Sequence, residues 1–202
     1  MARAPWVKLC GLRTVHDVEA AVAAGADALG FVLAPSVRQI DEATAARLLD
    51  AVPVGILAVA VTRHPTSEEL ALVERLPFDL LQGDATFVAE AAVPYWPVFP
   101  DGPDLALRIA ADPRRGLWGT VLVDGPRGGG RGEPADWDRV GALGVPVCLA
   151  GGLHSANVAE AIRVARPVAV DVSSGIEGER GRKDAARMRA FVAATRSDAI
   201  GT

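Results

Sequence analysis

A thiol and a carboxyl group each end a short apolar run of the chain, one near the N-terminus and one beyond its middle. Cys10 ends Val7–Cys10, and Asp124 ends Thr120–Asp124. Both groups can give or take a proton, so the two residues are candidates for a general base and a general acid. A free thiol has a pKa of about 8.5 and is largely protonated at neutral pH, and a nearby ammonium group would increase its thiolate fraction. The pair therefore indicates proton-transfer chemistry.

Glycine and serine runs later in the chain could bind phosphate. They contain Gly151, Gly152, Ser173, Ser174 and Gly175. Glycines let the backbone approach a ligand closely. A Ser-Ser-Gly run can present successive N–H groups at the start of a short helical turn, whose dipole favours an anion. Either run alone is ordinary turn sequence, but their joint placement after two successive strands predicts a phosphate site.

The elements that must position these groups alternate along the whole chain. Short β-branched runs are followed by stretches with helical period, which is the pattern of repeated βα units. The predicted strands are Val7–Cys10, Ala28–Leu33, Val54–Val61, Phe78–Leu81, Tyr95–Phe99, Thr120–Asp124, Val145–Ala150 and Val168–Val172. The predicted helices are Val15–Ala24, Ala43–Asp50, Ser67–Arg75, Phe87–Ala92, Asp104–Ala111, Asp136–Ala142, Ala156–Ala165 and Asp184–Ala194.

Eight strands joined by helical crossovers should be parallel and close into a (β/α)8 TIM barrel, here one compact domain over residues 1–202. An open, doubly wound sheet is the rival architecture. It usually carries a glycine-rich phosphate motif after its first strand, where this chain has Cys10–Arg13. The fourth and fifth units are the least regular, because prolines interrupt them. In a barrel, Cys10, Asp124 and the predicted phosphate residues all lie at the C-terminal ends of the strands.

Side-chain alternation predicts an ion pair inside this barrel. Lys8 and Cys10 share one face of the first strand, and Asp171 and Ser173 share one face of the last. The first and last strands are neighbours when a barrel closes, so we expect Lys8 and Asp171 to pair beneath Cys10. Either charge would be costly if it were buried alone. Cys148 lies inside an apolar strand and is interpreted as a packing residue.

The composition restricts the partners of the protein. Half of the 202 residues are apolar and the formal net charge is −4, which disfavours a nucleic-acid or anionic-membrane binder, since both need a basic surface. The longest apolar run, Ala51–Val61, is too short to cross a bilayer, and the early Lys8 leaves no room for a signal peptide. With only Cys10 and Cys148, we expect a cytoplasmic protein with free thiols. Its expected partner is a small phosphorylated molecule, and it is predicted to be a monomer or a homodimer.

The histidines and a glycine-rich tract carry weaker signals. No His/Cys spacing resembles a zinc site, so no metal is predicted. His16 and His64 are expected on the solvated surface, whereas the role of His154, close to the predicted phosphate residues, is open. The tract Gly128–Gly132 could be a mobile lid or a nucleic-acid-binding run, and the acidic character of the chain favours the lid.

Four segments of the chain resemble the phosphoribosylanthranilate isomerases, which are barrel enzymes of tryptophan biosynthesis. The segments are Val7–Leu12, Ala24–Val32, Leu149–Leu153 and Val170–Glu177. They occur in the family's order, with the intervals that a single barrel requires, and the resemblance spans nearly the whole chain. It implies an Amadori rearrangement of N-(5-phosphoribosyl)anthranilate without a metal or organic cofactor.

The resemblance also implies roles for individual residues. Asp124 matches the family's general acid, which protonates the ribose ring oxygen, and Cys10 matches the general base, which removes the C2′ proton. Arg38 matches an arginine expected near the anthranilate. The further candidates for substrate binding are Gly129, Gly130 and Asp171.

The chain departs from the family pattern around the aromatic end of the substrate. The family's Gln-Leu-His-Gly after the fourth strand appears here as Leu81–Asp84, which is interpreted as a shortened loop without the histidine. The loop after the second strand is also slightly short. Arg131 stands where the family has Thr or Ser, and Glu133 stands where a lysine is common. These changes leave the activity level and the exact aromatic substrate open.

Two alternative functions remain. A related isomerase of histidine biosynthesis, or a dual-specificity barrel, would use a second aspartate at the end of the first strand, where this chain has Cys10. A barrel that keeps the phosphate site but has lost catalysis would act as a binding or scaffold protein. Measuring turnover of phosphoribosylanthranilate distinguishes the three hypotheses.

Overall fold

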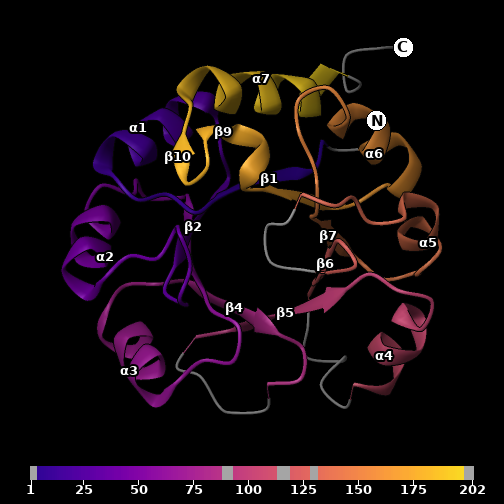
Figure 1. The fold of residues 1–202 in the computed structure, drawn as a ribbon, viewed down its shortest axis with the longest axis horizontal. Coiled ribbons are helices and arrows are strands. Elements are labelled where there is room, and N and C mark those ends of the chain that lie inside the picture. Colours follow the sequence, from indigo (N-terminus) through magenta and orange to yellow (C-terminus); the bar gives the residue numbers. More distant parts are fainter. Residues whose placement is uncertain (1–3, 88–92, 113–118, 128–131, 198–202) are drawn as a thin grey trace.

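The computed structural model of the chain describes residues 4–87, 93–112, 119–127 and 132–197. Within these residues, eight strands form a closed barrel in which each strand pairs with the next and the last pairs in parallel with the first. Figure 1 shows the barrel with the helices arranged around it. The predicted (β/α)8 fold is therefore confirmed.

Within the described residues, strands and helices alternate up to a short final hairpin, except that β4 is followed directly by β5. The barrel strands are β1 (Trp6–Cys10), β2 (Ala28–Val32), β3 (Leu57–Val61), β4 (Leu80–Asp84), β5 (Tyr95–Pro100), β6 (Val121–Asp124), β7 (Val147–Leu149) and β8 (Ala169–Val172). The helices are α1 (Val15–Ala24), α2 (Glu42–Leu49), α3 (Ser67–Arg75), α4 (Leu105–Ala111), α5 (Trp137–Gly141), α6 (Val158–Ala165) and α7 (Ala185–Arg196). After β8 come the 3₁₀ helix η2 (Ser174–Ile176) and the hairpin strands β9 (Glu177–Glu179) and β10 (Arg182–Lys183).

The barrel strands bury both of their faces, as parallel strands covered by helices do. Leu9 of β1 and Leu29 of β2 belong to the large apolar cluster that includes the buried faces of the helices, and both are fully buried. A separate small cluster, which includes Leu122, Cys148 and Ala169, fills part of the barrel interior. Cys148 is thus the packing residue that the sequence predicts, and both cysteines are free thiols.

Two of the helices begin with a complete capping box. The side chain of Thr14 accepts a hydrogen bond from the backbone of Asp17, whose side chain accepts one from the backbone of Thr14. Thr66 and Glu69 form the same reciprocal pair at the start of α3. Such a pair satisfies backbone N–H groups that a helix start leaves free, so it defines the first residue sharply. Both α1 and α3 have the predicted bounds.

The fourth strand begins and ends later than the predicted Phe78–Leu81. Phe78 lies before the strand and packs against Phe31, with the ring centroids 6.3 Å apart. The interpretation of Leu81–Asp84 as a shortened loop is wrong, because these residues continue β4 and pair with β5. Polar side chains at the end of β4 face the barrel mouth, so the apolar pattern that marks a strand stops before the strand does.

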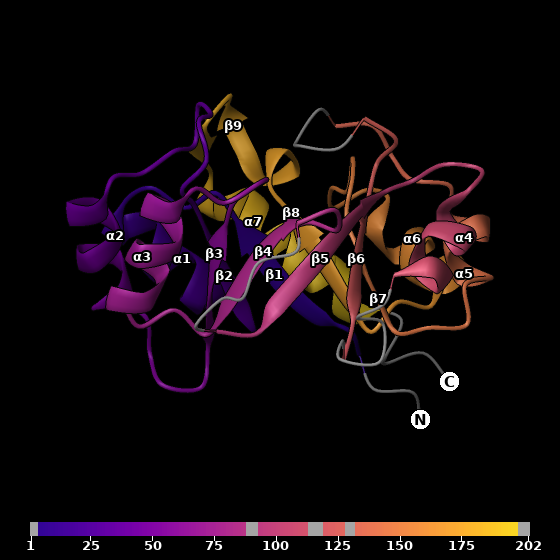
Figure 2. The ribbon, with the colours of Figure 1, turned by 90° about the horizontal axis from the view of Figure 1, so that it is seen from below.

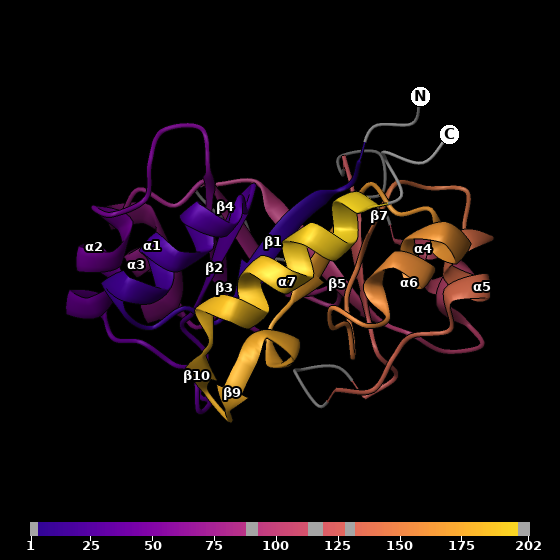
Figure 3. The ribbon, with the colours of Figure 1, turned by 90° about the horizontal axis from the view of Figure 1, so that it is seen from above.

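The end of the chain adds an element that the apolar pattern does not indicate. Figure 2 shows the β9–β10 hairpin at one end of the barrel, and because it follows β8 and η2 this is the C-terminal end of the strands. Figure 3 shows α7 lying across the outside of the barrel, where it contacts α1, α6 and β1. The predicted helix Phe87–Ala92 falls almost entirely outside the described residues. Of the helices that are described, none is long and apolar enough to span a membrane.

Candidate active site

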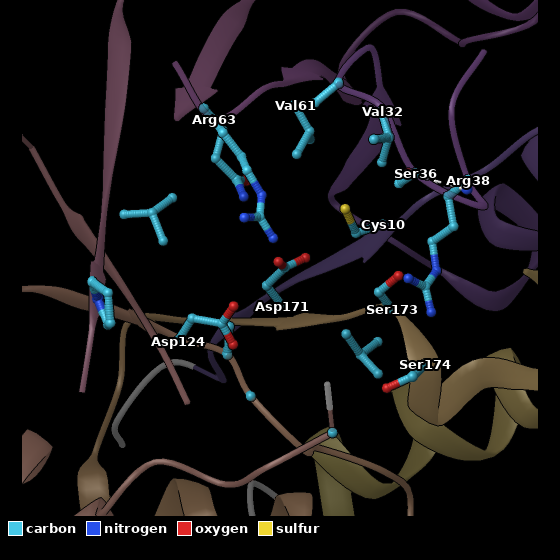
Figure 4. A pocket seen from close by; sticks show the side chains of 18 of the residues that line it. Cys10, Val32, Ser36, Arg38, Val61, Arg63, Asp124, Asp171, Ser173 and Ser174 are labelled. Carbon is cyan, nitrogen blue, oxygen red and sulfur yellow. Dashed lines mark hydrogen bonds between the residues drawn. The ribbon is translucent and has the colours of Figure 1, made fainter. Parts of the chain in front are cut away.

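A cavity of about 270 Å³ opens at the C-terminal ends of the barrel strands, where the sequence places the chemistry. The residues that the sequence singles out and that line this cavity are Cys10, Arg38, Asp124, Gly151, Gly152, Asp171, Ser173 and Ser174. Figure 4 shows the thiol of Cys10 and the carboxylates of Asp124 and Asp171 facing the same space. The structure therefore brings the proposed acid and base into one site. Gly129 and Gly130, together with most of the tract interpreted as a lid, lie outside the described residues.

Lys8 and Asp171 form a buried ion pair at the base of this cavity. Lys8 Nζ donates a 2.9 Å hydrogen bond to Asp171 Oδ1, and the residues are 1% and 8% exposed. They are direct register partners on β1 and β8, so the predicted pair is confirmed. Burial lowers the pKa of Lys8, but its attraction to the acidic groups around it, chiefly the Asp171 carboxylate, outweighs this, so the net shift is upward and Lys8 is an ammonium ion. Asp171 also lines the cavity, while its contact with substrate stays a prediction.

Cys10 ends β1 directly above this pair. The residue is 5% exposed, and Gly30 of β2 is packed so closely against it that an added Cβ would lie 2.7 Å from the sulfur. Burial raises the pKa of the Cys10 thiol, and Lys8 and Lys183 lower it only in part, so the net shift is upward. The thiol is therefore protonated at neutral pH, and its basic form is the minor species.

Asp124 ends β6 and is half-buried at the cavity wall. One of its carboxylate oxygens, Oδ1, accepts a 2.8 Å hydrogen bond from the backbone N–H of Gly125. Its backbone carbonyl accepts a hydrogen bond from the N–H of Asp101, which continues the β5–β6 pairing past the strand end. This pairing holds the carboxyl group at the mouth.

Four of the five predicted phosphate residues line the cavity on the β7 and β8 side: Gly151, Gly152, Ser173 and Ser174, called here the phosphate loop. Gly151 and Gly152 have φ values of +85° and +60°, which only glycine adopts without strain. The predicted helical turn is present as η2. Gly175 does not line the cavity, because it packs against Leu153, whose carbonyl oxygen would be 2.0 Å from an added Cβ. A phosphate contact of Gly175 stays a prediction.

A buried carboxylate on the hairpin joins two of these groups, and the sequence assigns it no role. Glu177 accepts hydrogen bonds of 2.6 and 2.9 Å from Arg38, one of 2.9 Å from Lys183 and one of 3.0 Å from the backbone of Gly181. Burial raises the pKa of Glu177, but these donors outweigh it and hold the pKa at about 2. Lys183 also donates to the carbonyl of Ser173 at 2.8 Å. Glu177 thus links the phosphate loop to Arg38.

Lys183 is itself an unusual cation in this cluster. Its side chain is 1% exposed, and burial lowers its pKa, an effect that the Glu177 carboxylate only partly offsets. The signal in the sequence is weak, because a basic residue after a glycine-rich turn is normally a solvated one. Only the folded hairpin places Lys183 against Ser173.

The opposite wall of the cavity carries polar residues that the predicted strand bounds assign to a loop. Gln82 of β4 lines the cavity and is 7% exposed, and its Oε1 has no hydrogen-bond partner among the described residues. Thr62 and Arg63, which follow β3, line the same wall. Asp84 at the end of β4 pairs with His64, whose Nε2 lies 3.2 Å from Asp84 Oδ2.

The remaining sequence predictions concern histidines and metals. His16 and His64 are exposed, as predicted. His154 is also exposed and does not line the cavity, and its Nδ1 accepts a hydrogen bond from the backbone N–H of Ala156 before α6. Within the described ranges, no group of three or more His, Cys, Asp or Glu residues is arranged to hold a metal ion.

Comparisons with known proteins agree with one another. The N-(5′-phosphoribosyl)anthranilate isomerase of Chromohalobacter salexigens is 46% identical over 197 residues, which is 92% of each chain. The phosphoribosyl anthranilate isomerase structure from Thermus thermophilus matches with a TM-score of 0.83 and 34% identity, covering 95% of this chain and 98% of that chain. A phosphoribosyl anthranilate isomerase structure in complex with reduced 1-(o-carboxyphenylamino)-1-deoxyribulose 5-phosphate matches with a TM-score of 0.79 and 27% identity. The match covers 95% of this chain and 98% of that chain.

A family model described as N-(5′-phosphoribosyl)anthranilate (PRA) isomerase matches residues 7–194. This range runs from β1 into α7, so it includes the whole barrel and the hairpin. It also contains every cavity residue described above. The chain belongs to the N-(5′-phosphoribosyl)anthranilate isomerase family.

Proposed function

We propose that this protein isomerises N-(5′-phosphoribosyl)anthranilate to 1-(2-carboxyphenylamino)-1-deoxyribulose 5-phosphate. The family membership supports this reaction. The observation that carries it is that Cys10 and Asp124 line one cavity together with the phosphate loop. A phosphorylated sugar anchored at that loop would place its ring between a thiol and a carboxyl group.

The reaction needs one proton delivered and one removed. Asp124 gives a proton to the ribose ring oxygen, the bond from C1′ to that oxygen breaks, and the nitrogen lone pair forms a protonated Schiff base with C1′. Cys10 then removes the proton from C2′, and the electrons of that C–H bond form the enolamine. The enolamine tautomerises to the 2-keto product. Each general acid or base step typically contributes about 10²–10⁴-fold to the rate.

The ammonium groups near Cys10 assist the second step. Lys8 and Lys183 both act on the Cys10 thiol and favour its ionised form against the effect of burial. Two fixed positive charges therefore stabilise the negative charge that forms on the sulfur. Because Asp171 pairs with Lys8, it moderates this effect and keeps the barrel interior close to neutral.

The phosphate loop fixes the other end of the sugar. The positive φ values of Gly151 and Gly152 bring the backbone close to the cavity, and Lys183 holds the carbonyl of Ser173 in place. Arg38 lines the cavity beside this loop with Nε and Nη2 bound to Glu177, and its expected place near the anthranilate stays a prediction. Fixing the phosphate orients C2′ for proton removal, which is how a remote group contributes to rate.

We also place the protein in a reducing cytoplasm, because Cys10 acts as a base only as a free thiol and both cysteines are unpaired here. The oligomeric state is proposed as monomer or homodimer. The relative from Thermotoga maritima is described both as dimeric and as monomers generated from it.

Turnover of freshly made phosphoribosylanthranilate tests the proposed function. Isomerisation should remove anthranilate fluorescence, and Cys10→Ala and Asp124→Asn should each lower kcat by at least about 10²-fold. Full activity in either variant would contradict the mechanism. Binding of the reduced product analogue without turnover in the parent protein would favour a non-catalytic phosphate-binding barrel.

A further inference from the structure

Asp101 is a buried carboxylate that the proposed reaction does not use. It directly follows β5, its side chain is 4% exposed, and it does not line the cavity that Asp124 faces in Figure 4. Burial raises the pKa of Asp101, but its hydrogen-bond donors outweigh this and hold the pKa below its ordinary value. A buried charge is costly unless it is paired and hydrogen-bonded, so its donors show which elements it holds together.

The donors to the Asp101 carboxylate come from the turn after β5 and from the start of α5. The backbone N–H of Asp136, whose side chain caps α5, donates to Oδ2 at 2.7 Å. Arg139 of α5 donates to both oxygens, at 2.8 and 2.9 Å, and the backbone N–H of Gly102 donates to Oδ1 at 2.8 Å. The carboxylate therefore fixes the first turn of α5 to the end of β5.

The backbone of the same residue is bound to the proposed general acid. The N–H of Asp101 donates a 2.8 Å hydrogen bond to the carbonyl of Asp124. Asp124 ends β6 and Asp136 precedes α5, so these two residues lie at opposite ends of the segment that joins β6 to α5. Asp101 is thus bonded to both ends of this segment, to one through its backbone and to the other through its side chain.

Contacts within the β6–α5 segment connect its far end to the Asp124 carboxyl group. Glu133 packs so closely on Gly125 that an added Cβ on Gly125 would lie 2.0 Å from the Glu133 carbonyl oxygen. Arg127 and Glu133 also form an ion pair across the segment. Gly125 in turn donates its backbone N–H to Asp124 Oδ1. A shift of the Asp136 end therefore displaces Glu133 against Gly125, and with it the donor that orients Asp124.

We propose that Asp101 is a positioning residue for the general acid: its carboxylate holds the Asp136 end of the β6–α5 segment and thereby orients Asp124 toward the ribose ring oxygen. This inference rests on the proposed function. An acid must lie within hydrogen-bond reach of the atom that it protonates, and a displacement of about 1 Å can lower a rate by about 100-fold. Asp101 itself contacts no substrate in this arrangement and acts only through Asp124.

The test measures the loss of anthranilate fluorescence in a single turnover. The protein is in saturating excess over phosphoribosylanthranilate, so that neither binding nor product release enters the rate, and a blank without protein corrects for spontaneous decay of the substrate. Asp101→Ala removes the acceptor for the Asp136 N–H and should lower the first-order rate constant by about 10- to 100-fold. Asp101→Asn keeps one acceptor oxygen but loses the charge that pairs with Arg139, so it should lower the rate constant by only about three- to tenfold.

Asp104→Ala is the matched control. It removes a carboxylate from the same turn after β5, where Asp104 forms an exposed pair with Arg108, and should keep the rate constant of the parent. Urea unfolding identifies conditions under which every variant is folded. If Asp101→Ala does not fold, Asp101→Asn carries the same comparison.

A double-mutant cycle shows whether Asp101 acts through Asp124. Asp124→Asn removes the acid, so no positioning is left for Asp101 to supply. Adding Asp101→Ala to Asp124→Asn should therefore change the rate constant by less than about threefold. A residue that only supports the fold, or another part of the site, would lower the rate constant by the same factor in both backgrounds.

Amide hydrogen exchange gives a second measurement that does not depend on turnover. Exchange should be faster in Asp101→Ala than in Asp104→Ala over residues 132–137, which lead into α5, because the Asp136 N–H loses its acceptor. Exchange in η2, after β8, should stay at the rate of the parent. This contrast shows directly whether the carboxylate holds the end of the segment.

Three results would overturn the assignment of Asp101. They are a parent rate constant in Asp101→Ala, an equal loss in the parent and Asp124→Asn backgrounds, and unchanged exchange over residues 132–137. Failure of the proposed function has a different signature, because the parent protein would then not isomerise phosphoribosylanthranilate at all. A parent that isomerises while Asp101→Ala keeps its rate constant separates the two failures.

Discussion

Lys8 Nζ lies 2.9 Å from Asp171 Oδ1 inside the barrel, directly below the cavity that contains Cys10. The two residues come from the first and last barrel strands, 163 positions apart in the chain. Their pairing therefore depends on closure of the barrel. It places one positive and one negative charge beneath the thiol, and the positive one favours its ionised form.

Replacing Lys8 with methionine should destabilise the protein strongly. The change leaves the Asp171 carboxylate buried without its partner, which typically costs about 3–5 kcal/mol. Urea denaturation at neutral pH measures the free energy of unfolding. Arg75→Met, which breaks an exposed pair with Glu42, should cost less than about 1 kcal/mol and serves as the control. Equal stabilities of Lys8→Met and the parent would show that the pair contributes nothing.

The thiolate of Cys10 should form at a higher pH than the thiolate of an ordinary free cysteine. Burial raises the pKa of the Cys10 thiol, and the ammonium groups of Lys8 and Lys183 offset this only in part. Ultraviolet titration of the thiolate in Cys148→Ala, which keeps Cys10 alone, measures this pKa. The double variant Cys10→Ala/Cys148→Ala has no thiol and serves as the control. A pKa at or below that of a free thiol, about 8.5, would contradict the effect of burial.

The fold could be predicted because each unit repeats the same physical pattern. β1 and β8 alternate strictly between residues that face the helices and residues that face the interior, so even the Lys8–Asp171 pair followed from closing the barrel. The predicted bounds of β4 are wrong because Gln82 and Asp84 are polar, although both belong to the strand. A strand that ends in a binding site carries polar residues at that end, so its apolar alternation stops before the strand does.

The candidate site was only partly predictable, for a related reason. Cys10 and Asp124 could be found because each ends an apolar run before a glycine. Glu177 could not be assigned a role, because its partner Arg38 lies 139 positions away and the hairpin that carries it has no β-branched pattern. Arg63 could not be assigned to the cavity either, since it follows β3 in the sequence like any charged turn residue and only the folded barrel shows that it lines the site.

Replacing Glu177 with glutamine should reduce the loss of unfolding free energy that the protein suffers as the pH falls. The pKa of Glu177 is about 2 in the folded protein and about 4.5 when unperturbed. Between these values the unfolded chain binds more protons, so stability rises with pH and is lost as the pH falls through this window. Glu177→Gln should therefore lower stability by about 1–3 kcal/mol near pH 7, since it weakens the hydrogen bonds to Arg38 and Lys183.

The difference between Glu177→Gln and the parent should shrink as the pH approaches 2, because the parent then loses the same charge. Unfolding by urea at a series of pH values measures this difference. Glu160→Gln on α6 is the control, since Glu160 forms only an exposed pair with Arg163 and should follow the parent. A difference that stays constant from neutral to acid pH would mean that the Glu177 charge is not the cause.

Replacing Gly151 with alanine should disturb the phosphate loop more than backbone strain alone would, because the added Cβ would also collide with neighbouring backbone atoms. Gly151 has φ +85°, and an added Cβ would lie 2.4 Å from the backbone N of Gly125 and 2.8 Å from the carbonyl oxygen of Glu133. Gly144 also has a positive φ, +68°, but no atom lies within 4 Å of an added Cβ. Gly144→Ala therefore isolates the cost of the left-handed conformation, about 1–3 kcal/mol.

Gly151→Ala should cost more stability than Gly144→Ala, because the backbone of Gly125 and Glu133 must also move. Gly125 follows Asp124, so the displacement reaches the proposed general acid as well as the phosphate loop. We therefore expect Gly151→Ala to raise the KM for phosphoribosylanthranilate and lower kcat, while Gly144→Ala leaves both unchanged. Steady-state kinetics under conditions where both variants are folded measures this contrast. Equal kinetics in the two variants would mean that the close contact between the β6 and β7 loops does not position the acid.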